Sequence, residues 1–284
     1  MASDGPVRWQ CRHRTIDLAR PVVMGILNVT PDSFSDGGRF AGLDAALERA
    51  AQMVAEGAAV IDVGGESTRP GSAGVDAATE CARIVPVIER IAAEHDVAIS
   101  IDSSKLEVMI AAVDAGASIV NDVRALRAPG ARDWAASAGV GVCLMHMRGE
   151  PLTMQESPEY HDVVGEVGGF LVRERAACLE AGIAHESMVL DPGVGFGKRH
   201  EHNIALLKNL QHIAALGSPL LVGLSRKSLI GKVLGRPILE RLYGGLGLAA
   251  WAVSMGARVV RTHDVGATQD AIRMVSTVME GTAN

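Results

Sequence analysis

Three polar residues stand directly after short apolar runs, where a buried charge or amide needs a partner. They are Asp102, Asn121 and Asp191. An ionised carboxylate at such a point is costly unless it is paired or hydrogen-bonded, so a salt bridge or a loop cap is one interpretation of each residue taken alone. Together, acceptors at equivalent positions suit a flat heterocycle with several N–H donors and a ring carbonyl. Lys227 could satisfy a ring acceptor or balance the carboxylates.

A second group has the chemistry of a phosphate site. Arg261 and His263 follow the apolar pair Val259–Val260, and alternate residues of a strand face the same side. A guanidinium grips phosphate oxygens with two parallel hydrogen bonds. A surface arginine is the alternative, although the preceding apolar pair favours a position at the end of a buried strand.

Two loops rich in turn residues follow the first two apolar runs. Residues 28–38 contain one apolar ring, Phe34, and residues 64–71 have a similar composition. Loops of this kind often close over active sites, and flexible connectors are the alternative.

These candidate residues must be positioned by strands that alternate with helices. Buried strands are expected at 22–29, 58–63, 97–101, 118–120, 140–145, 188–190, 219–222 and 259–260. Helices are expected at 41–56, 79–94, 105–115, 162–181, 203–216, 240–255 and 267–279. Such alternation gives either a closed (β/α)₈ barrel or a doubly wound open sheet. We predict the TIM barrel, because its active site collects the carboxyl ends of all its strands, which explains a polar residue at each strand end.

Length and composition agree with one such domain. A (β/α)₈ barrel needs about 250 residues and the chain has 284, of which 48% are hydrophobic but only 3% aromatic. We therefore expect an N-terminal extension over residues 1–20 and one barrel domain over 21–284, with a core of aliphatic side chains. Four glycines at helix ends are expected to be C-terminal caps: Gly57, Gly116, Gly182 and Gly256.

Charge and cysteine content exclude several other classes. A net charge of −6 gives no general attraction to nucleic acid or an anionic membrane, and no apolar stretch approaches the roughly 20 residues of a membrane span. The four cysteines form no C-x-x-C pair and are expected to be reduced thiols in the cytoplasm. The glycine-rich run at 191–198 fits neither the phosphate-loop nor the dinucleotide pattern, and no H-E-x-x-H motif suggests zinc.

Eight segments resemble dihydropteroate synthase along essentially the whole chain. The two longest are V-M-G-I-L-N-V-T-P-D-S-F-S-D-G-G (23–38) and I-D-V-G-G-E-S-T-R-P-G (61–71). S-I-D-S-S-K, I-V-N-D-V, C-L-M-H-M, L-D-P-G-V-G-F-G-K, V-G-L-S-R-K-S and R-T-H-D-V follow in order. Two departures are Leu106, where relatives often have proline, and residues 243–245; both lie away from the matched pocket.

The resemblance implies that 4-aminobenzoate displaces pyrophosphate from 6-hydroxymethyl-7,8-dihydropterin pyrophosphate, giving 7,8-dihydropteroate for folate synthesis. It also implies Mg²⁺ and a homodimer formed through helices on the far side of the barrel. The residues matched to the pterin pocket are Asp102, Asn121, Met145, Asp191, Phe196, Gly223, Lys227 and Arg261. Those matched to pyrophosphate are Asn28, Thr68, Arg261 and His263, with Asn28 also the metal ligand. Those matched to 4-aminobenzoate, the site that sulfonamides occupy, are Phe34, Arg69, Pro70 and Ser225.

The resemblance also suggests how these residues act. Asp102, Lys227 and Arg261 are the expected catalytic residues, because the difficult step is loss of pyrophosphate from a ring that becomes cationic. Two alternatives stay open. A pterin-dependent methyltransferase domain shares the barrel and much of the pocket but needs no pyrophosphate clamp. A catalytically silent barrel that serves as a binding partner usually loses strand-end residues, and none of the matched ones is missing here.

Overall fold

The computed structural model describes residues 7–30, 38–66, 74–149, 154 and 158–281. In chain order its elements are β1 (Arg8–Cys11), β2 (Arg14–Asp17), β3 (Val22–Asn28), α1 (Gly38–Ala55), β4 (Val60–Gly64), α2 (Ala77–Glu94), β5 (Ala98–Asp102), α3 (Leu106–Asp114), β6 (Ile119–Asp122), α4 (Ala131–Ala138), β7 (Gly141–Met145), α5 (Val163–Glu180), η2 (His185–Ser187), β8 (Met188–Asp191), α6 (His200–Lys208), α7 (Leu210–Ala214), β9 (Leu220–Gly223), α8 (Ser228–Leu234), η3 (Ile238–Glu240), α9 (Leu242–Ser254), β10 (Ala257–Thr262) and α10 (Val265–Glu280).

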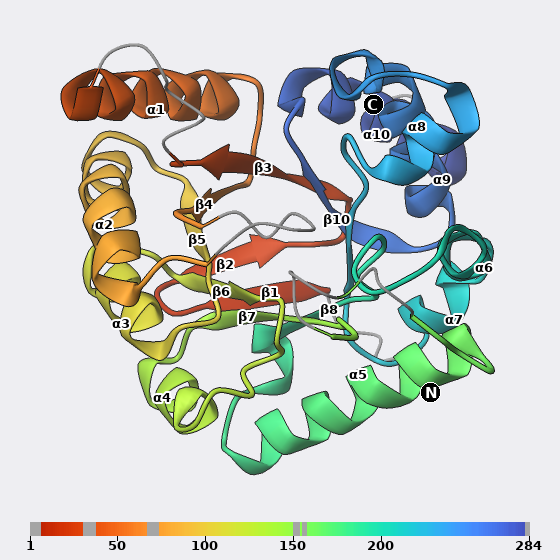
Figure 1. Ribbon diagram of the computed structural model, residues 1–284, viewed down its shortest axis with the longest axis horizontal. Coiled ribbons are helices and arrows are strands. Elements are labelled where there is room, and N and C mark those ends of the chain that lie inside the picture. The colour runs from red at the N-terminus through yellow and green to blue at the C-terminus, as the bar shows by residue number, and fades with distance from the viewer. Residues whose placement is uncertain (1–6, 31–37, 67–73, 150–153, 155–157, 282–284) are drawn as a thin grey trace.

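Eight parallel strands close into a barrel in the order β10-β3-β4-β5-β6-β7-β8-β9, and helices surround it (Figure 1). This confirms the predicted (β/α)₈ barrel and excludes the open sheet, in which two edge strands would lack a partner. All eight expected strands are present. No helix within the described ranges is long and apolar enough to cross a membrane.

Alternate strand residues divide between two cores. In β4, Ile61 and Val63 point outward and pack with buried residues of α2 such as Ile84 and Ile88. The residue between them, Asp62, points into the barrel, where it contacts Asn121 and Arg261. This alternation has the period of two residues that a strand imposes, and it decides which side chains reach the site.

The barrel interior is apolar at its floor and polar above it. One residue from each strand forms the floor: Met24, Val60, Ala98, Ile119, Cys143, Val189, Leu221 and Val259. Two positions further along their strands stand Asp62, Ser100, Asn121, Asp191 and Arg261. The polar layer therefore lies toward the carboxyl ends of the strands, where barrel active sites form.

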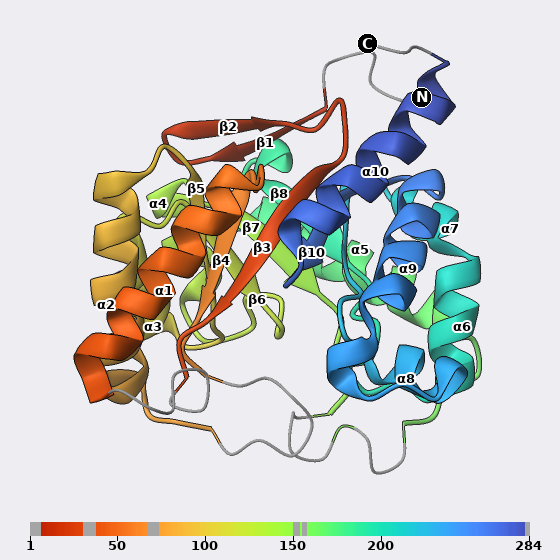
Figure 2. The ribbon, with the colours of Figure 1, turned by 90° about the horizontal axis from the view of Figure 1, so that it is seen from above.

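The β1–β2 hairpin covers the floor of the barrel. Trp9, Cys11, Ile16 and Leu18 belong to the same apolar cluster as the floor residues, and the Trp9 indole donates to the carbonyl of Ser187 at 3.0 Å. Figure 2 shows the hairpin at the end of the barrel where β3 begins. The hairpin lies within residues 1–20, and the predicted domain boundary at residue 20 stays a prediction.

Outside the eight barrel strands, the prediction of secondary structure was less complete. The hairpin, α4 and α8 were missed, and the expected helix at 203–216 is two helices, α6 and α7, which meet at Asn209. The buried side chains Leu206, Leu210 and Ile213 keep helical spacing across this break, so periodicity alone does not reveal it. The expected helix at 240–255 begins instead as the separate turn η3.

The predicted glycine caps are confirmed. Gly57, Gly116, Gly182 and Gly256 all have positive φ, from +91° to +122°, and each donates its N–H to a carbonyl three residues earlier in the preceding helical turn. A side chain would be strained in that conformation. Each glycine thus ends a helix and turns the chain toward the next strand.

Candidate active site

A buried cluster of charged groups lies in the upper part of the barrel. Arg261 on β10 donates from Nε to Asp62 Oδ2 and from Nη2 to Asp102 Oδ2, both at 2.6 Å. Asn121 on β6 donates from Nδ2 to the same Asp62 oxygen at 3.1 Å. Four side chains from β4, β5, β6 and β10 thus form one hydrogen-bonded group.

Burial and competing charge set the electrostatics of this cluster. Desolvation raises the pKa of Asp102 to about 7, with Arg261 pulling it down and Asp62 pushing it further up. Desolvation acts to lower the pKa of Arg261, but Asp62 and Asp102 outweigh it and raise that pKa. Because two carboxylates share one guanidinium, the cluster favours an additional proton or a cationic ligand.

A second set of matched residues faces the cluster from β8 and from the segment after β9. The Lys227 ammonium lies 4.1 Å from the centroid of the Phe196 ring, a cation–π contact. Burial lowers the pKa of Lys227 to about 8, while the charge of Asp191 opposes this shift. Burial raises the pKa of Asp191, whose Oδ1 accepts from the Gly193 N–H at 2.7 Å. Lys227 and Asp191 therefore form a second pair of opposite charges in the same region.

The segment after β8 is held by a buried lysine that the sequence interpretation overlooked. Lys198 Nζ donates to the carbonyls of Gly193 at 2.9 Å and Phe196 at 3.0 Å, and lies 2.9 Å from His146 Nδ1. Phe196 packs in one apolar cluster with Met145. Lys198 therefore fixes Phe196 directly, and Met145 packs in the same cluster. The resemblance assigns both residues to the walls of the pterin pocket.

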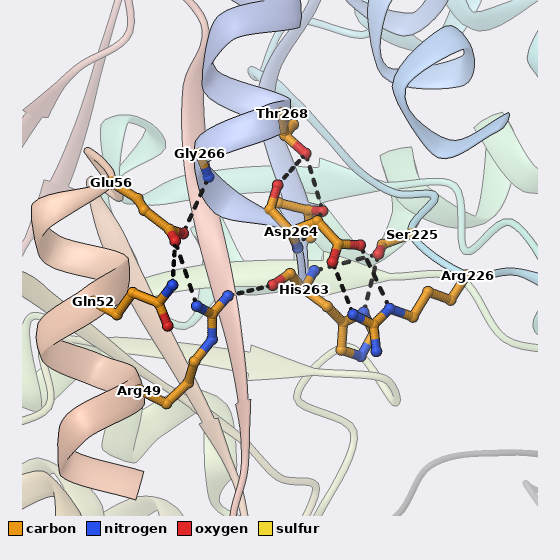
Figure 3. A network of polar contacts seen from close by, with 10 residues as sticks. Arg49, Gln52, Glu56, Ser225, Arg226, His263, Asp264, Gly266 and Thr268 are labelled. Atoms are coloured by element: carbon orange, nitrogen blue, oxygen red, sulfur yellow. Dashed lines mark hydrogen bonds and ion pairs between the residues drawn. The ribbon is translucent and has the colours of Figure 1, made fainter. Parts of the chain in front are cut away.

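His263 is positioned by a polar network that joins α1, β10 and the segment after β9 (Figure 3). Its Nδ1 lies 3.0 Å from Ser225 Oγ, and its carbonyl accepts from Arg49 Nη2 at 2.7 Å. Arg226 has positive φ, +58°, and pairs with Asp264 at 2.8 Å. These contacts tie the segment that carries Ser225 to the end of β10.

Two further matched residues lie at the rim. Asn28 ends β3 and Gly223 ends β9. A Cβ added to Gly64 would stand 3.7 Å from Asn28 Oδ1 and 3.9 Å from Asp102 Oδ2, so these two oxygens face the same small space beside Gly64. A Cβ on Gly223 would lie 3.9 Å from the Cβ of Arg261.

The structure thus brings Asp102 and Arg261 into direct contact and joins Asn121 to them through Asp62. Asp191, Lys227 and Phe196 lie beside them. Ser225 contacts His263 rather than the charged cluster. Four predicted residues lie outside the described residues: Phe34, Thr68, Arg69 and Pro70.

Sequence reasoning missed the residue at the centre of the cluster. Asp62 is fully buried, yet it was counted only as part of an apolar run. The signal was present: a carboxylate between Ile61 and Val63 lies on the opposite face from both, and a buried charge requires partners. Lys198 had no comparable signal, because its partners are mostly backbone carbonyls. Arg49 contacts the His263 carbonyl and the Glu56 carboxylate, and only the folded structure shows that it reaches His263.

Comparisons with known proteins agree with this geometry. A family model described as pterin binding enzyme matches residues 24–263, which defines the class as pterin-binding barrels. The dihydropteroate synthase of Escherichia coli K12 is 50% identical over 95% of this chain and 96% of its own length. At that identity and coverage, the chain belongs to the dihydropteroate synthase family.

Two solved structures extend the comparison to bound ligands. The Xanthomonas albilineans dihydropteroate synthase with 4-aminobenzoic acid has a TM-score of 0.92 and 46% identity, covering 97% of this chain and 99% of that one. The same enzyme in complex with 7,8-dihydropteroate has a TM-score of 0.88 and 44% identity, and the match covers 96% of this chain and 98% of that one.

Proposed function

We propose that this chain joins 4-aminobenzoate to 6-hydroxymethyl-7,8-dihydropterin pyrophosphate and forms 7,8-dihydropteroate and pyrophosphate. The observation that carries the proposal is the buried group of Asp62, Asp102, Asn121 and Arg261, with Lys227 and Asp191 beside it. Such a set offers acceptors, an amide and a cation to one polar heterocycle. Relatives with 4-aminobenzoic acid and 7,8-dihydropteroate bound support the choice of substrate and product.

In the proposed reaction, the amine nitrogen bonds to the pterin methylene carbon as the bond from that carbon to the pyrophosphate oxygen breaks. One amine proton is released. The amine is already a nucleophile, so no serine or cysteine attack is required. The residues must instead hold the ring, stabilise positive charge that develops on it, and receive a negatively charged leaving group.

Each matched residue has a part in this scheme. Asp102 stabilises the cationic ring, while Asn121 and Asp191 accept hydrogen bonds from its N–H groups. Lys227 donates to a ring acceptor and Arg261 meets the ring and the leaving group. His263, held by Ser225, receives pyrophosphate. Ser225 also borders the proposed aminobenzoate site, with Phe34, Arg69 and Pro70, and Thr68 joins the pyrophosphate site.

We also propose Mg²⁺ as a cofactor, held by Asn28. The amide oxygen of Asn28 and the carboxylate of Asp102 are hard ligands that face the same space. Within the described residues, no three His, Cys, Asp or Glu side chains gather into a metal site, so most ligands would come from pyrophosphate and water. When bound, the ion would neutralise charge on the leaving group.

We propose a homodimer for the intact protein. Of the 14 large apolar residues that are exposed within the described ranges, nine lie between Val233 and Met279, on α8, η3, α9 and α10. Leu239 and Tyr243 are each 82% exposed. Extended apolar surface of this kind favours association. Sedimentation equilibrium should give twice the 29.7 kDa of one chain, and a monomer at micromolar concentration would contradict the proposal.

We place the protein in the cytoplasm. All four cysteines are free thiols, and three of them, Cys11, Cys143 and Cys178, are buried. Unpaired buried thiols are typical of proteins from reducing compartments.

The activity is tested by incubating the purified protein with both substrates and Mg²⁺ and identifying the product by mass spectrometry. Formation of 7,8-dihydropteroate is expected. A methyltransferase domain or a silent barrel would form none, and absence of this product under conditions where the E. coli relative forms it would overturn the proposal.

A further inference from the structure

Asp62 belongs to the polar layer of the barrel, together with Asn121 and Arg261, two of the residues matched to the pterin. In the strand register it stands beside Ser100, whereas Asp102 is two residues further along β5. Its side chain is fully buried. Its oxygen Oδ2 contacts Asn121 and Arg261, so Asp62 can act on a ligand through these two neighbours.

The contact with Asn121 determines how that amide is turned. A carboxylate oxygen only accepts hydrogen bonds, so the amide nitrogen of Asn121 must face Asp62 Oδ2, 3.1 Å away. The carbonyl oxygen of Asn121 is then directed away from Asp62. This orientation presents an acceptor, rather than a donor, to a ligand in the pocket.

The contact with Arg261 fixes the plane of the guanidinium. Asp62 binds Nε while Asp102 binds Nη2, so two carboxylates on neighbouring strands grip separate nitrogens. A pterin that donates hydrogen bonds to Asp102 would compete for one of these contacts. The contact to Asp62 is the more enclosed of the two, because the Asp62 side chain is 0% exposed and the Asp102 side chain is 8% exposed.

We propose that Asp62 is a positioning residue that sets specificity for the pterin: it turns Asn121 to present an acceptor and holds Arg261 in place while Asp102 engages the ring. This inference rests on the proposed dihydropteroate synthase activity. The second Asp62 oxygen, Oδ1, is buried without a hydrogen-bond partner among the described residues. A purely structural carboxylate would usually have both oxygens satisfied, so this geometry favours a role beyond packing.

The test is steady-state kinetics of Asp62→Asn with each substrate varied in turn. The substitution keeps the shape of the side chain, removes its charge and adds a hydrogen-bond donor. The side-chain amide of Asn121 can then flip, so that its oxygen faces residue 62. The KM for pterin pyrophosphate should rise about tenfold or more, the change expected for one hydrogen bond to a charged group. The KM for 4-aminobenzoate should stay within about twofold. Unchanged KM values for both substrates would overturn the inference.

Ser100→Ala is the matched control. Ser100 is fully buried in the same layer, and its hydroxyl has no partner among the described residues. Removing it disturbs the packing of that layer without touching Asn121 or Arg261, so the KM for pterin pyrophosphate should stay near the wild-type value. An equal rise in both variants would make the effect one of packing and would overturn the inference.

Asp62→Glu separates position from charge and provides a second test if Asp62→Asn folds poorly. The longer side chain keeps the charge but moves the carboxylate away from its two partners. The inference predicts a raised KM for pterin pyrophosphate here as well, whereas a residue that supplied only charge would leave it unchanged.

A double-mutant cycle tests the link to Asn121. If Asp62 acts partly through that amide, Asp62→Asn should raise the KM for pterin pyrophosphate less in an Asn121→Ala background than in the wild type. Full additivity would contradict the link. A wild-type chain that forms no dihydropteroate would defeat the proposed function instead, so the two failures are distinguishable.

Discussion

Asp102→Asn tests whether this buried carboxylate stabilises the reaction or only binds the ring. The substitution preserves shape, removes one negative charge and leaves Arg261 its 2.6 Å bond to Asp62. Loss of one preorganised electrostatic partner costs about 2.7–4 kcal/mol of transition-state stabilisation, so kcat should fall by about 10²- to 10³-fold. The KM for pterin pyrophosphate should change much less than kcat.

The same substitution should not destabilise the fold. Burial raises the pKa of Asp102 from 3.8 to about 7, so the folded protein holds this proton more tightly than the unfolded chain does. The stability that this proton contributes is complete below pH 3.8 and is lost as the pH rises through about 7. At pH 8 the ionised group therefore costs on the order of a few kcal/mol, which the amide avoids.

The assays are product formation with both substrates varied and urea unfolding at pH 5 and pH 8. Asp102→Asn should unfold at the same or a higher urea concentration than wild type at pH 8, with a smaller difference at pH 5. Asp114→Asn, which alters an exposed carboxylate at the end of α3, is the control and should change neither property. A rise in KM alone would make Asp102 a binding residue, and a loss of stability at pH 8 would refute the electrostatic reasoning.

Three other predictions concern pH, the barrel floor and the order of binding. Because Asp102 should act ionised and Lys227 charged, kcat/KM for pterin pyrophosphate should fall below pH about 7 and above pH about 8; a flat profile from pH 6 to 9 would count against both assignments. Trp9→Ala should lower the free energy of unfolding by about 3–5 kcal/mol, with little change in KM, because the indole is fully buried at the opposite end of the barrel; equal stability by urea unfolding would contradict this role. Calorimetry should find 4-aminobenzoate bound well only when pterin and pyrophosphate are present, because three of its four matched residues stand in the two segments that the sequence predicts to close over the site; equal affinity with and without pyrophosphate would refute the order.

The fold was largely predictable from the sequence because the barrel imposes a regular pattern. Each buried strand is a short aliphatic run, and a polar residue stands at its carboxyl end or within two residues after it. The exceptions were elements whose identity depends on tertiary contacts. The hairpin's Trp9 and Cys11 are buried only because the barrel floor lies above them, and α4 is too short to show a clear helical period.

The site was predictable to the extent that residues stand at strand ends. Asp102, Asn121 and Arg261 are in hydrogen-bonded contact through Asp62 or directly, as the topology requires of strand ends in one barrel. Asp62 could not be singled out by position at a strand end, because it lies in the middle of β4. Lys198 was missed because its partners are mainly carbonyls of its own loop, which depend on backbone conformation rather than on side-chain type.

The most direct test of the account is pyrophosphate release from the pterin substrate, measured with and without 4-aminobenzoate. The account predicts rapid release only when the amine is present, with one 7,8-dihydropteroate formed for each pyrophosphate. Release at the same rate without the amine, or none with it, would contradict the central claim.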